Sequence, residues 1–215
     1  MVSDIINKIN EMFLNGYKYL HLPLKTSREI SFTEENSNTK NTEVKYTAAN
    51  HLLALKFDAD INEINKCGKS IKIANGDMFL FFEDISGLKK MCDYIVFYKF
   101  DQKIKDQTPQ THLFCFLINL KSEKTGTSPK QLKAAEIFAE FIFAHAKLLL
   151  DLKKEIHFIK TLHKTPSSTL NKTSKKNTKP KAEYNYSETL QITRKADFDN
   201  LCKRYFSYFN EKIPS

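Results

Sequence analysis

Two short patterns in the middle of the chain combine residue types that metal-dependent hydrolysis uses. Asp93 stands near the start of the apolar run 92–100, while Asn119 and Lys121 close the apolar run 113–121. Side chains alternate across a strand, so those of Asn119 and Lys121 share one face. If Asp93 meets them at the same edge of a sheet, its carboxylate and the Asn119 amide can supply oxygen ligands to Mg²⁺ or Mn²⁺.

An ion bound there would polarise a phosphodiester and lower the pKa of a bound water. Lys121 would orient this water and offset charge on the pentavalent transition state. Gln131, at the start of an expected helix, would contact the water or the phosphate. The patterns therefore predict catalytic roles for four residues, Asp93, Asn119, Lys121 and Gln131.

The order of these residues resembles the PD-(D/E)XK nuclease superfamily. In that superfamily an Asp leads one core strand, E-x-K lies on the next, and some branches add a Gln on the following helix. The resemblance covers roughly residues 70 to 150. It implies an α/β fold with a restriction-endonuclease-like core, a mixed central β-sheet flanked by helices.

Asn119 departs from this family pattern, which has Glu at the same place. An amide oxygen can ligate a metal but brings no negative charge, so metal affinity should fall. Glu123 falls on the same face if the strand continues, and Glu83 or Asp84 ends a preceding strand. Each could supply the missing carboxylate, and the sequence leaves this choice open. The candidate metal ligands are thus Asp93, Asn119, Glu123 and Glu83.

The elements that must position these residues follow from the spacing of apolar residues. Helices are expected over 3–15, 48–64, 129–150 and 197–210. Strands are expected over 70–74, 78–82, 92–100, 113–121, 156–162 and 190–193, the first two joined at Asn75-Gly76. Continuous apolar runs are typical of central strands that are covered on both faces.

Two polar segments interrupt the pattern. Residues 25–43 are rich in Ser, Thr, Asn and Glu and predict a surface loop. Residues 164–181 predict a mobile loop with six lysines and no acid. These lysines are candidate nucleic-acid-binding residues: Lys164, Lys172, Lys175, Lys176, Lys179 and Lys181.

Composition favours one soluble domain over residues 1–215 with a polyanionic partner. The net charge is +9, from 34 Lys and Arg against 25 Asp and Glu, so nucleic acid is the first partner to consider. The four cysteines form no C-x-x-C pair, which argues against a zinc site or a disulfide framework. No apolar stretch approaches the roughly 20 residues of a membrane span, and the N-terminus lacks signal-peptide features, so we expect a cytoplasmic protein without membrane contact.

The chain lacks the sequence motifs of other common enzyme classes. There is no H-E-x-x-H, no G-x-S-x-G and no P-loop, and only 5 glycines are present. Each predicted site residue also has an ordinary interpretation: Asp93 as a strand cap, Lys121 as a solvated strand end, Gln131 as an exposed helix start. Their joint order at compatible spacing favours the nuclease-like interpretation.

Three functions stay open at this point. The first is a Mg²⁺-dependent endonuclease acting on DNA in a restriction or phage-defence system, the setting being an analogy with the family. The second is a catalytically weakened member of the fold that binds nucleic acid or a partner protein, as Asn119 suggests. The third is a plain protein-interaction subunit. A protein partner in a defence complex and association into homo-oligomers are both left open.

Overall fold

The computed structural model describes residues 2–13, 18–22, 27–34, 42–57, 61–64, 70–73, 91–103, 109–121, 128–150, 155–164, 189–192 and 195–210. The helices in this part of the chain are α1 (Val2–Met12), α2 (Ser128–Leu150) and α3 (Phe198–Asn210). The strands are β1 (Lys18–Leu22), β2 (Arg28–Glu34), β3 (Thr42–Ala48), β4 (Leu52–Lys56), β5 (Ile61–Ile64), β6 (Ser70–Ile73), β7 (Tyr94–Gln102), β8 (Gln110–Lys121), β9 (Ile156–Lys164), β10 (Leu190–Ile192) and β11 (Lys195–Asp197). Among the helices so described, none combines the length and apolar character that crossing a bilayer requires.

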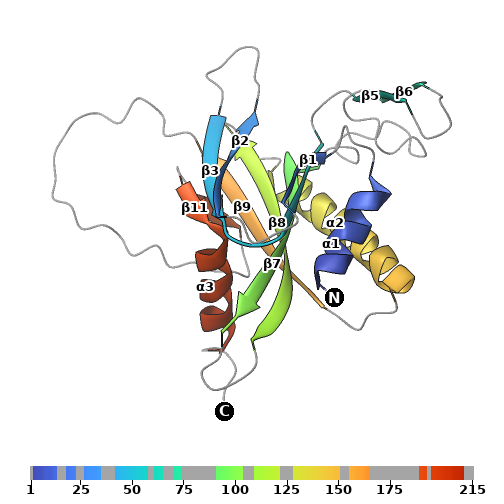
Figure 1. The fold of residues 1–215 in the computed structure, drawn as a ribbon. Helices are drawn as coiled ribbons and strands as arrows, with labels where there is room; N and C mark the ends of the chain where they lie inside the picture. The colour runs from blue at the N-terminus through green and yellow to red at the C-terminus, as the bar shows by residue number, and fades with distance from the viewer. Residues whose placement is uncertain are drawn as a thin grey trace, which may run out of the picture.

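The main sheet is mixed and has six strands in the order β1-β4-β7-β8-β9-β10. Neighbours from β1 to β8 run antiparallel, whereas β9 is parallel to β8 and β10 is parallel to β9. Parallel neighbours need a long crossover, and the 23-residue α2 lies in the connection between β8 and β9. The expected α/β class, a mixed sheet flanked by helices, is confirmed (Figure 1).

One face of the main sheet is covered by α1 and α2, which lie side by side (Figure 1). Alternate residues of the central strands, including Ile95, Phe97 and Leu117, pack in one cluster with Ile6 of α1 and Leu132 of α2. This is the first of two cores that share the same strands.

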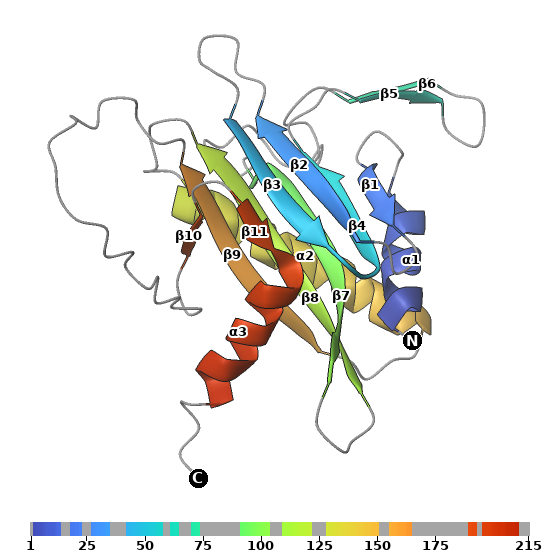
Figure 2. The ribbon, with the colours of Figure 1, turned by 60° about the vertical axis from the view of Figure 1, so that its left-hand side comes forward.

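The opposite face carries the second core, closed by α3 and by a three-stranded sheet in the order β11-β3-β2 (Figure 2). Tyr94 and Phe116 belong to it, and Phe198 of α3 stacks on Tyr46 of β3 with ring centroids 4.5 Å apart. Because both faces are covered, every residue from 113 to 120 is buried. This two-sided burial explains the continuous apolar run in the sequence.

Most of the predicted elements are confirmed with small shifts at their ends. The helices over 3–15, 129–150 and 197–210 correspond to α1, α2 and α3. The strands over 92–100, 113–121, 156–162 and 190–193 correspond to β7, β8, β9 and β10. The strand over 70–74 is β6, and it pairs with β5. Residues 74–90, with the predicted Asn75-Gly76 hairpin, lie outside the described residues.

The predicted surface loop over 25–43 is wrong in its central part, because β2 lies there and pairs with β3. Ile30 and Phe32 are buried, whereas Ser31 and Thr33 are only partly covered. A strand with one face toward solvent needs an apolar residue only at every second position. β2 therefore needs only two buried apolar residues, Ile30 and Phe32, to pack against the core. Two such residues leave the composition of segment 25–43 largely polar.

The predicted helix over 48–64 is also wrong, since β4 occupies residues 52–56 between β1 and β7. Leu52 and Ala54 belong to the second core, whereas Leu53 and Leu55 belong to the first. Burial on both sides produces four consecutive apolar residues. Periodicity alone does not distinguish such a run from a segment of buried helix.

A small polar cluster is sealed inside the second core. The hydroxyl of Tyr46 lies 2.8 Å from Nε2 of His163, and it donates a hydrogen bond to Thr161 Oγ1 at 3.3 Å. Burial lowers the pKa of His163 to about 3, although a hydrogen bond to the backbone of Ile192 opposes this effect. His163 is therefore neutral in the folded chain at every pH near neutrality.

This burial predicts a pH dependence of stability. In the unfolded chain His163 gains a proton near its ordinary pKa of 6.5, while in the folded chain it stays neutral down to about 3. The stability that depends on neutral His163 is thus complete above pH 6.5 and is lost as the pH falls toward 3. Replacing His163 with Phe should make the free energy of unfolding less dependent on pH, by up to about 1.4 kcal/mol per pH unit below that pKa. Urea unfolding across this pH range measures the slope.

Tyr46→Phe is the matched control, because it removes the same hydrogen bond and leaves the histidine in place. It should lower stability and keep the native pH slope. An unchanged slope in His163→Phe would show that the acid sensitivity arises elsewhere.

Candidate functional site

Asp93 is fixed at the point where β7 begins beside the end of β8. Tyr94 of β7 pairs with Ile118 of β8, which sets Asp93 across from Asn119. The side chain is only 8% exposed, and Oδ2 accepts a hydrogen bond from the backbone N–H of Leu120 at 2.5 Å. The carboxylate therefore ties the two strand ends together.

Asn119 projects from β8 toward the helical layer, on the side that also carries Leu117. It is completely buried, and its Nδ2 donates a hydrogen bond to Oε1 of Gln131 at 3.1 Å. Gln131 lies in the first turn of α2, so the start of the helix is tied to the end of β8. The Oδ1 atom of Asn119 is buried and accepts no hydrogen bond from any described residue.

Lys121 is the last residue of β8 and stands two positions beyond Asn119, on the same face by strand alternation. Its side chain lies outside the described part of the structure, as do Glu83, Asp84 and Glu123. The structure thus brings Asp93, Asn119 and Gln131 together at one end of the β7–β8 pair. Three of the four predicted catalytic residues share one place, and the backbone of the fourth adjoins it.

The predicted nucleic-acid-binding lysines lie almost entirely beyond the described residues. Lys164 ends β9, where its backbone pairs with Lys121 of β8, and its side chain is not described. The other five fall in 165–188, outside the described residues: Lys172, Lys175, Lys176, Lys179 and Lys181.

No protein-family model, no curated protein and no solved structure matches this chain.

The donor set at this strand end fits a hard divalent cation, with a low total charge. The Asp93 carboxylate and the Asn119 amide oxygen are the oxygen ligands that Mg²⁺ and Mn²⁺ prefer, and Mg²⁺ usually keeps several waters. Among the described residues, no three Asp, Glu, His or Cys side chains gather as a metal cluster would. An ion held by the described groups would therefore have one carboxylate to neutralise it.

The described cysteines do not offer an alternative nucleophile. Cys92, Cys115 and Cys202 are free and buried. Burial raises the pKa of each thiol well above its ordinary value, and Asp93 adds to the effect at Cys92. The thiols stay protonated and behave as small core residues.

The structure also joins two histidines that sequence spacing did not connect. His21 of β1 and His51, just before β4, face each other with their Nε2 atoms 3.1 Å apart. Burial, with the charges of His21 and Lys99, lowers the pKa of His51 to about 4, although Asp4 opposes this effect. One neutral ring donates to the other, and the described residues supply no third metal ligand beside the pair. His21 and His51 are 30 positions apart in the sequence, so no short motif links them.

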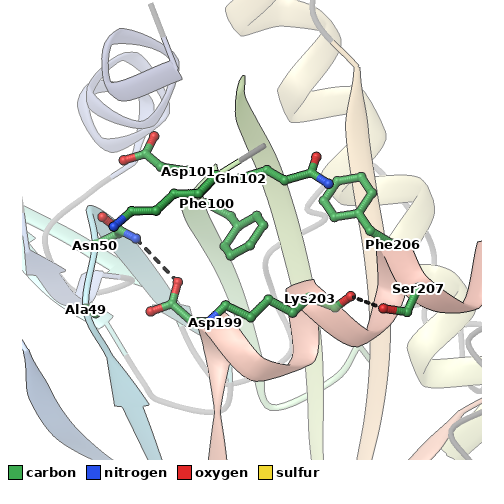
Figure 3. A pocket seen from close by; sticks show the side chains of 10 residues that line it. Ala49, Asn50, Phe100, Asp101, Gln102, Asp199, Lys203, Phe206 and Ser207 are labelled. Atoms are coloured by element: carbon green, nitrogen blue, oxygen red, sulfur yellow. Dashed lines mark hydrogen bonds between the residues drawn. The ribbon is translucent and has the colours of Figure 1, made fainter. Parts of the chain in front are cut away.

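A hollow of about 570 Å³ opens at the far end of β7, about 30 Å from Asp93 along the strand (Figure 3). It lies between the turn before β4, the end of β7 and α3. Asn50 Nδ2 donates a 3.4 Å hydrogen bond to Asp199 Oδ1, and the Tyr98 hydroxyl also bonds this carboxylate. Burial raises the pKa of Asp199, while these hydrogen bonds lower it. The carboxylate is thus held by the fold itself, and the hollow is separate from the predicted site.

The buried polar groups of Asp93 and Asn119 predict different effects of two substitutions on the free energy of unfolding. Asp93→Ala leaves the buried Leu120 N–H without its acceptor, which should cost about 1–3 kcal/mol. Asn119→Leu removes a buried amide whose oxygen has no described partner, so it should leave the free energy of unfolding unchanged or raise it. Chemical unfolding of the two variants and the native chain gives the comparison. A loss above about 1 kcal/mol in Asn119→Leu would show that the amide serves the fold.

Proposed function

We propose that this chain is a Mg²⁺-dependent endonuclease of nucleic acid, with DNA as the favoured substrate, acting in a restriction or phage-defence setting. The observation that carries the proposal is the buried Asn119 amide oxygen, which has no described hydrogen-bond partner and belongs to the residue opposite Asp93 in the register of β7 and β8. A buried polar atom of this kind, two residues from Lys121 on the same strand, suits a cation better than it suits a core.

The arrangement of elements supports the same proposal. Among the elements of the main sheet and the helices on its first face, the chain order is α1, β1, β4, β7, β8, α2, β9 and β10. The residue pattern of the resemblance thus lies on two central strands and on the helix that follows them. The strand carrying Asp93 adjoins the strand carrying Asn119 and Lys121, as the proposed chemistry requires.

Each residue has a distinct proposed role. Asp93 and Asn119 would hold the ion, which polarises the phosphodiester and activates a bound water when present. Lys121 would orient that water and offset negative charge in the transition state. Gln131 acts as a positioning residue: by accepting from Asn119 Nδ2 it fixes which way the amide oxygen points. Glu123 or Glu83 remains the proposed source of a second carboxylate.

A second candidate is a catalytically weakened protein of the same fold that binds nucleic acid or a partner protein. The specific observation in its favour is the complete burial of Asn119, which limits the access of a substrate phosphate to this side chain. The neutral amide also neutralises a cation less than the family's carboxylate would. The two candidates differ in cleavage of nucleic acid, and the second can bind nucleic acid or a partner protein.

Substitutions at the doubtful positions separate these candidates. Asn119→Glu restores a carboxylate beside Asp93, so it should tighten Mg²⁺ binding and raise or create cleavage of DNA. Lys121→Ala should abolish cleavage and spare DNA binding, because one lysine is a small part of a basic surface. Lys130→Ala, an exposed lysine at the start of α2, is the matched control for lost charge.

Calorimetric titration with Mg²⁺ and nicking of supercoiled DNA are measured on the same protein samples. If both the native chain and Asn119→Glu fail to cut DNA or RNA with Mg²⁺ or Mn²⁺, the weakened binding protein is the better assignment. Cleavage that persists in Lys121→Ala would remove the proposed role of this lysine.

The lysine-rich segment predicts a salt-dependent, sequence-independent share of binding. Each phosphate contact releases condensed counterions, so five lysines contribute to the slope of log affinity against log salt. Replacing Lys172, Lys175, Lys176, Lys179 and Lys181 with Ser keeps the chain length and should flatten that slope by up to about 4.5 for duplex DNA. Fluorescence anisotropy over a salt series measures it. An unchanged slope would assign the segment a linker role.

A further inference from the structure

The outer surface of α2 exposes more apolar area than a solvated helix needs. Six large apolar side chains are exposed in the described part of the chain, and four of them lie on this one helix. They are Ile137 at 57%, Phe141 at 56%, Leu148 at 80% and Leu149 at 64% exposed. Single exposed apolar residues are ordinary, but a cluster on one element marks an interaction surface.

Three of these residues and Ala144 form a straight stripe. At about 100° per residue, positions 137, 141, 144 and 148 fall within an arc of roughly 60°. The buried residues Ala135, Ala139 and Ala146 lie on the opposite side of the helix, against the main sheet. The stripe therefore faces away from the molecule, while Leu149 stands outside the arc. We call residues 137, 141, 144 and 148 the outer stripe.

The spacing of residues along the outer stripe is the same from either end. Its spacings are four, three and four residues, so an antiparallel second helix with the same stripe meets it in register. Ile137 then faces Leu148 of the second copy, and Phe141 faces Ala144 of the second copy. A large ring opposite a small methyl group allows the two helices to approach closely. A two-fold dimer requires this kind of self-complementary patch.

The charges beside the stripe follow the same symmetry. Glu140 and Lys147 lie on one flank, about 20° apart around the helix. In a two-fold antiparallel pair each flank faces the same flank of the other copy. Glu140 of one chain then lies within about one turn of Lys147 of the second copy, twice per interface. The pairs add little affinity but oppose other registers.

We propose that the outer face of α2 is the interface between two copies of this chain, packed antiparallel about a two-fold axis between residues 142 and 143. The proposal rests on the exposure and spacing of the outer stripe and on the charges beside it, and it is independent of the proposed nuclease activity. It commits to a second copy because the spacing and the flanking charges are both self-complementary, a property that a different partner or a lipid surface does not require.

Sedimentation velocity of the full chain over a concentration series tests this interface. The native chain should form a dimer that dissociates on dilution. Phe141→Arg should raise the dimer dissociation constant by about tenfold or more, as loss of a central aromatic side chain does. Leu149→Arg is the matched control, since it removes an equally exposed leucine outside the stripe, and it should leave the dimer intact.

Charge reversal tests the register. Glu140→Lys and Lys147→Glu should each weaken the dimer, and the double variant should restore it, because the pair is re-formed with its signs exchanged. A native chain that stays monomeric at its highest soluble concentration would overturn the proposal. So would a dimer that survives Phe141→Arg, or one that is lost equally in Leu149→Arg. All of these side chains are exposed or half-buried, so circular dichroism should confirm native folding in each variant.

Discussion

Both faces of the β7–β8 pair are covered over residues 94–98 and 113–120, and this constraint shapes the rest of the molecule. Burial on both sides requires alternate residues of each strand to serve two different cores. Ile95, Phe97 and Leu117 pack under the helices, while Tyr94 and Phe116 pack under the second sheet. A polar group placed here must find a partner within the protein. The strand ends, where Asp93 and Asn119 lie, are the places where such partners can be supplied by side chains.

The second core depends on contacts between residues that are far apart in the sequence. β11 pairs in parallel with β3, and α3 follows at once, so Phe198 reaches Tyr46. Lys45 and Lys195 both bind Glu29 across this small sheet, at 3.0 and 2.6 Å. These ion pairs are solvent-exposed and contribute little to stability. Aromatic packing holds α3 on the two sheets, since Phe198 stacks on Tyr46 of β3 and on Tyr98 of β7.

Sequence reasoning succeeded where local pattern and burial agree. Continuous apolar runs predicted β7 and β8, and a stripe of small and apolar residues predicted α2. It failed at β2, where the alternation contains only two buried apolar residues within a polar segment, and at β4, which is buried on both faces and shows no alternation. β2 and β4 form strands because they pair with other strands, β2 with β3 and β4 with β1 and β7. A single sequence does not show which segments pair.

At the candidate site, too, some contacts could be predicted from local sequence pattern and others could not. The proximity of Asp93 to Asn119, and of Asn119 to Gln131, could be predicted because strand alternation and short connections fix it. The hydrogen bond from the Leu120 amide to Asp93 could not, since every residue carries a backbone N–H and no motif marks the one that is used. The contact between Asn50 and Asp199 could not be predicted either, because the two residues are 149 positions apart.

Asn119 is the residue at which stability and chemistry diverge. Its neighbours on β8 gain free energy by burial, whereas a buried amide oxygen without a partner costs about 1–3 kcal/mol. The bond to Gln131 satisfies the nitrogen and leaves that cost at the oxygen. A cation or a water at this oxygen would remove the penalty and would itself be held more firmly by the Asp93 charge. A bound ion would then stabilise the folded chain by mass action whether or not catalysis follows, so metal-dependent stability and cleavage are separable properties of this strand end.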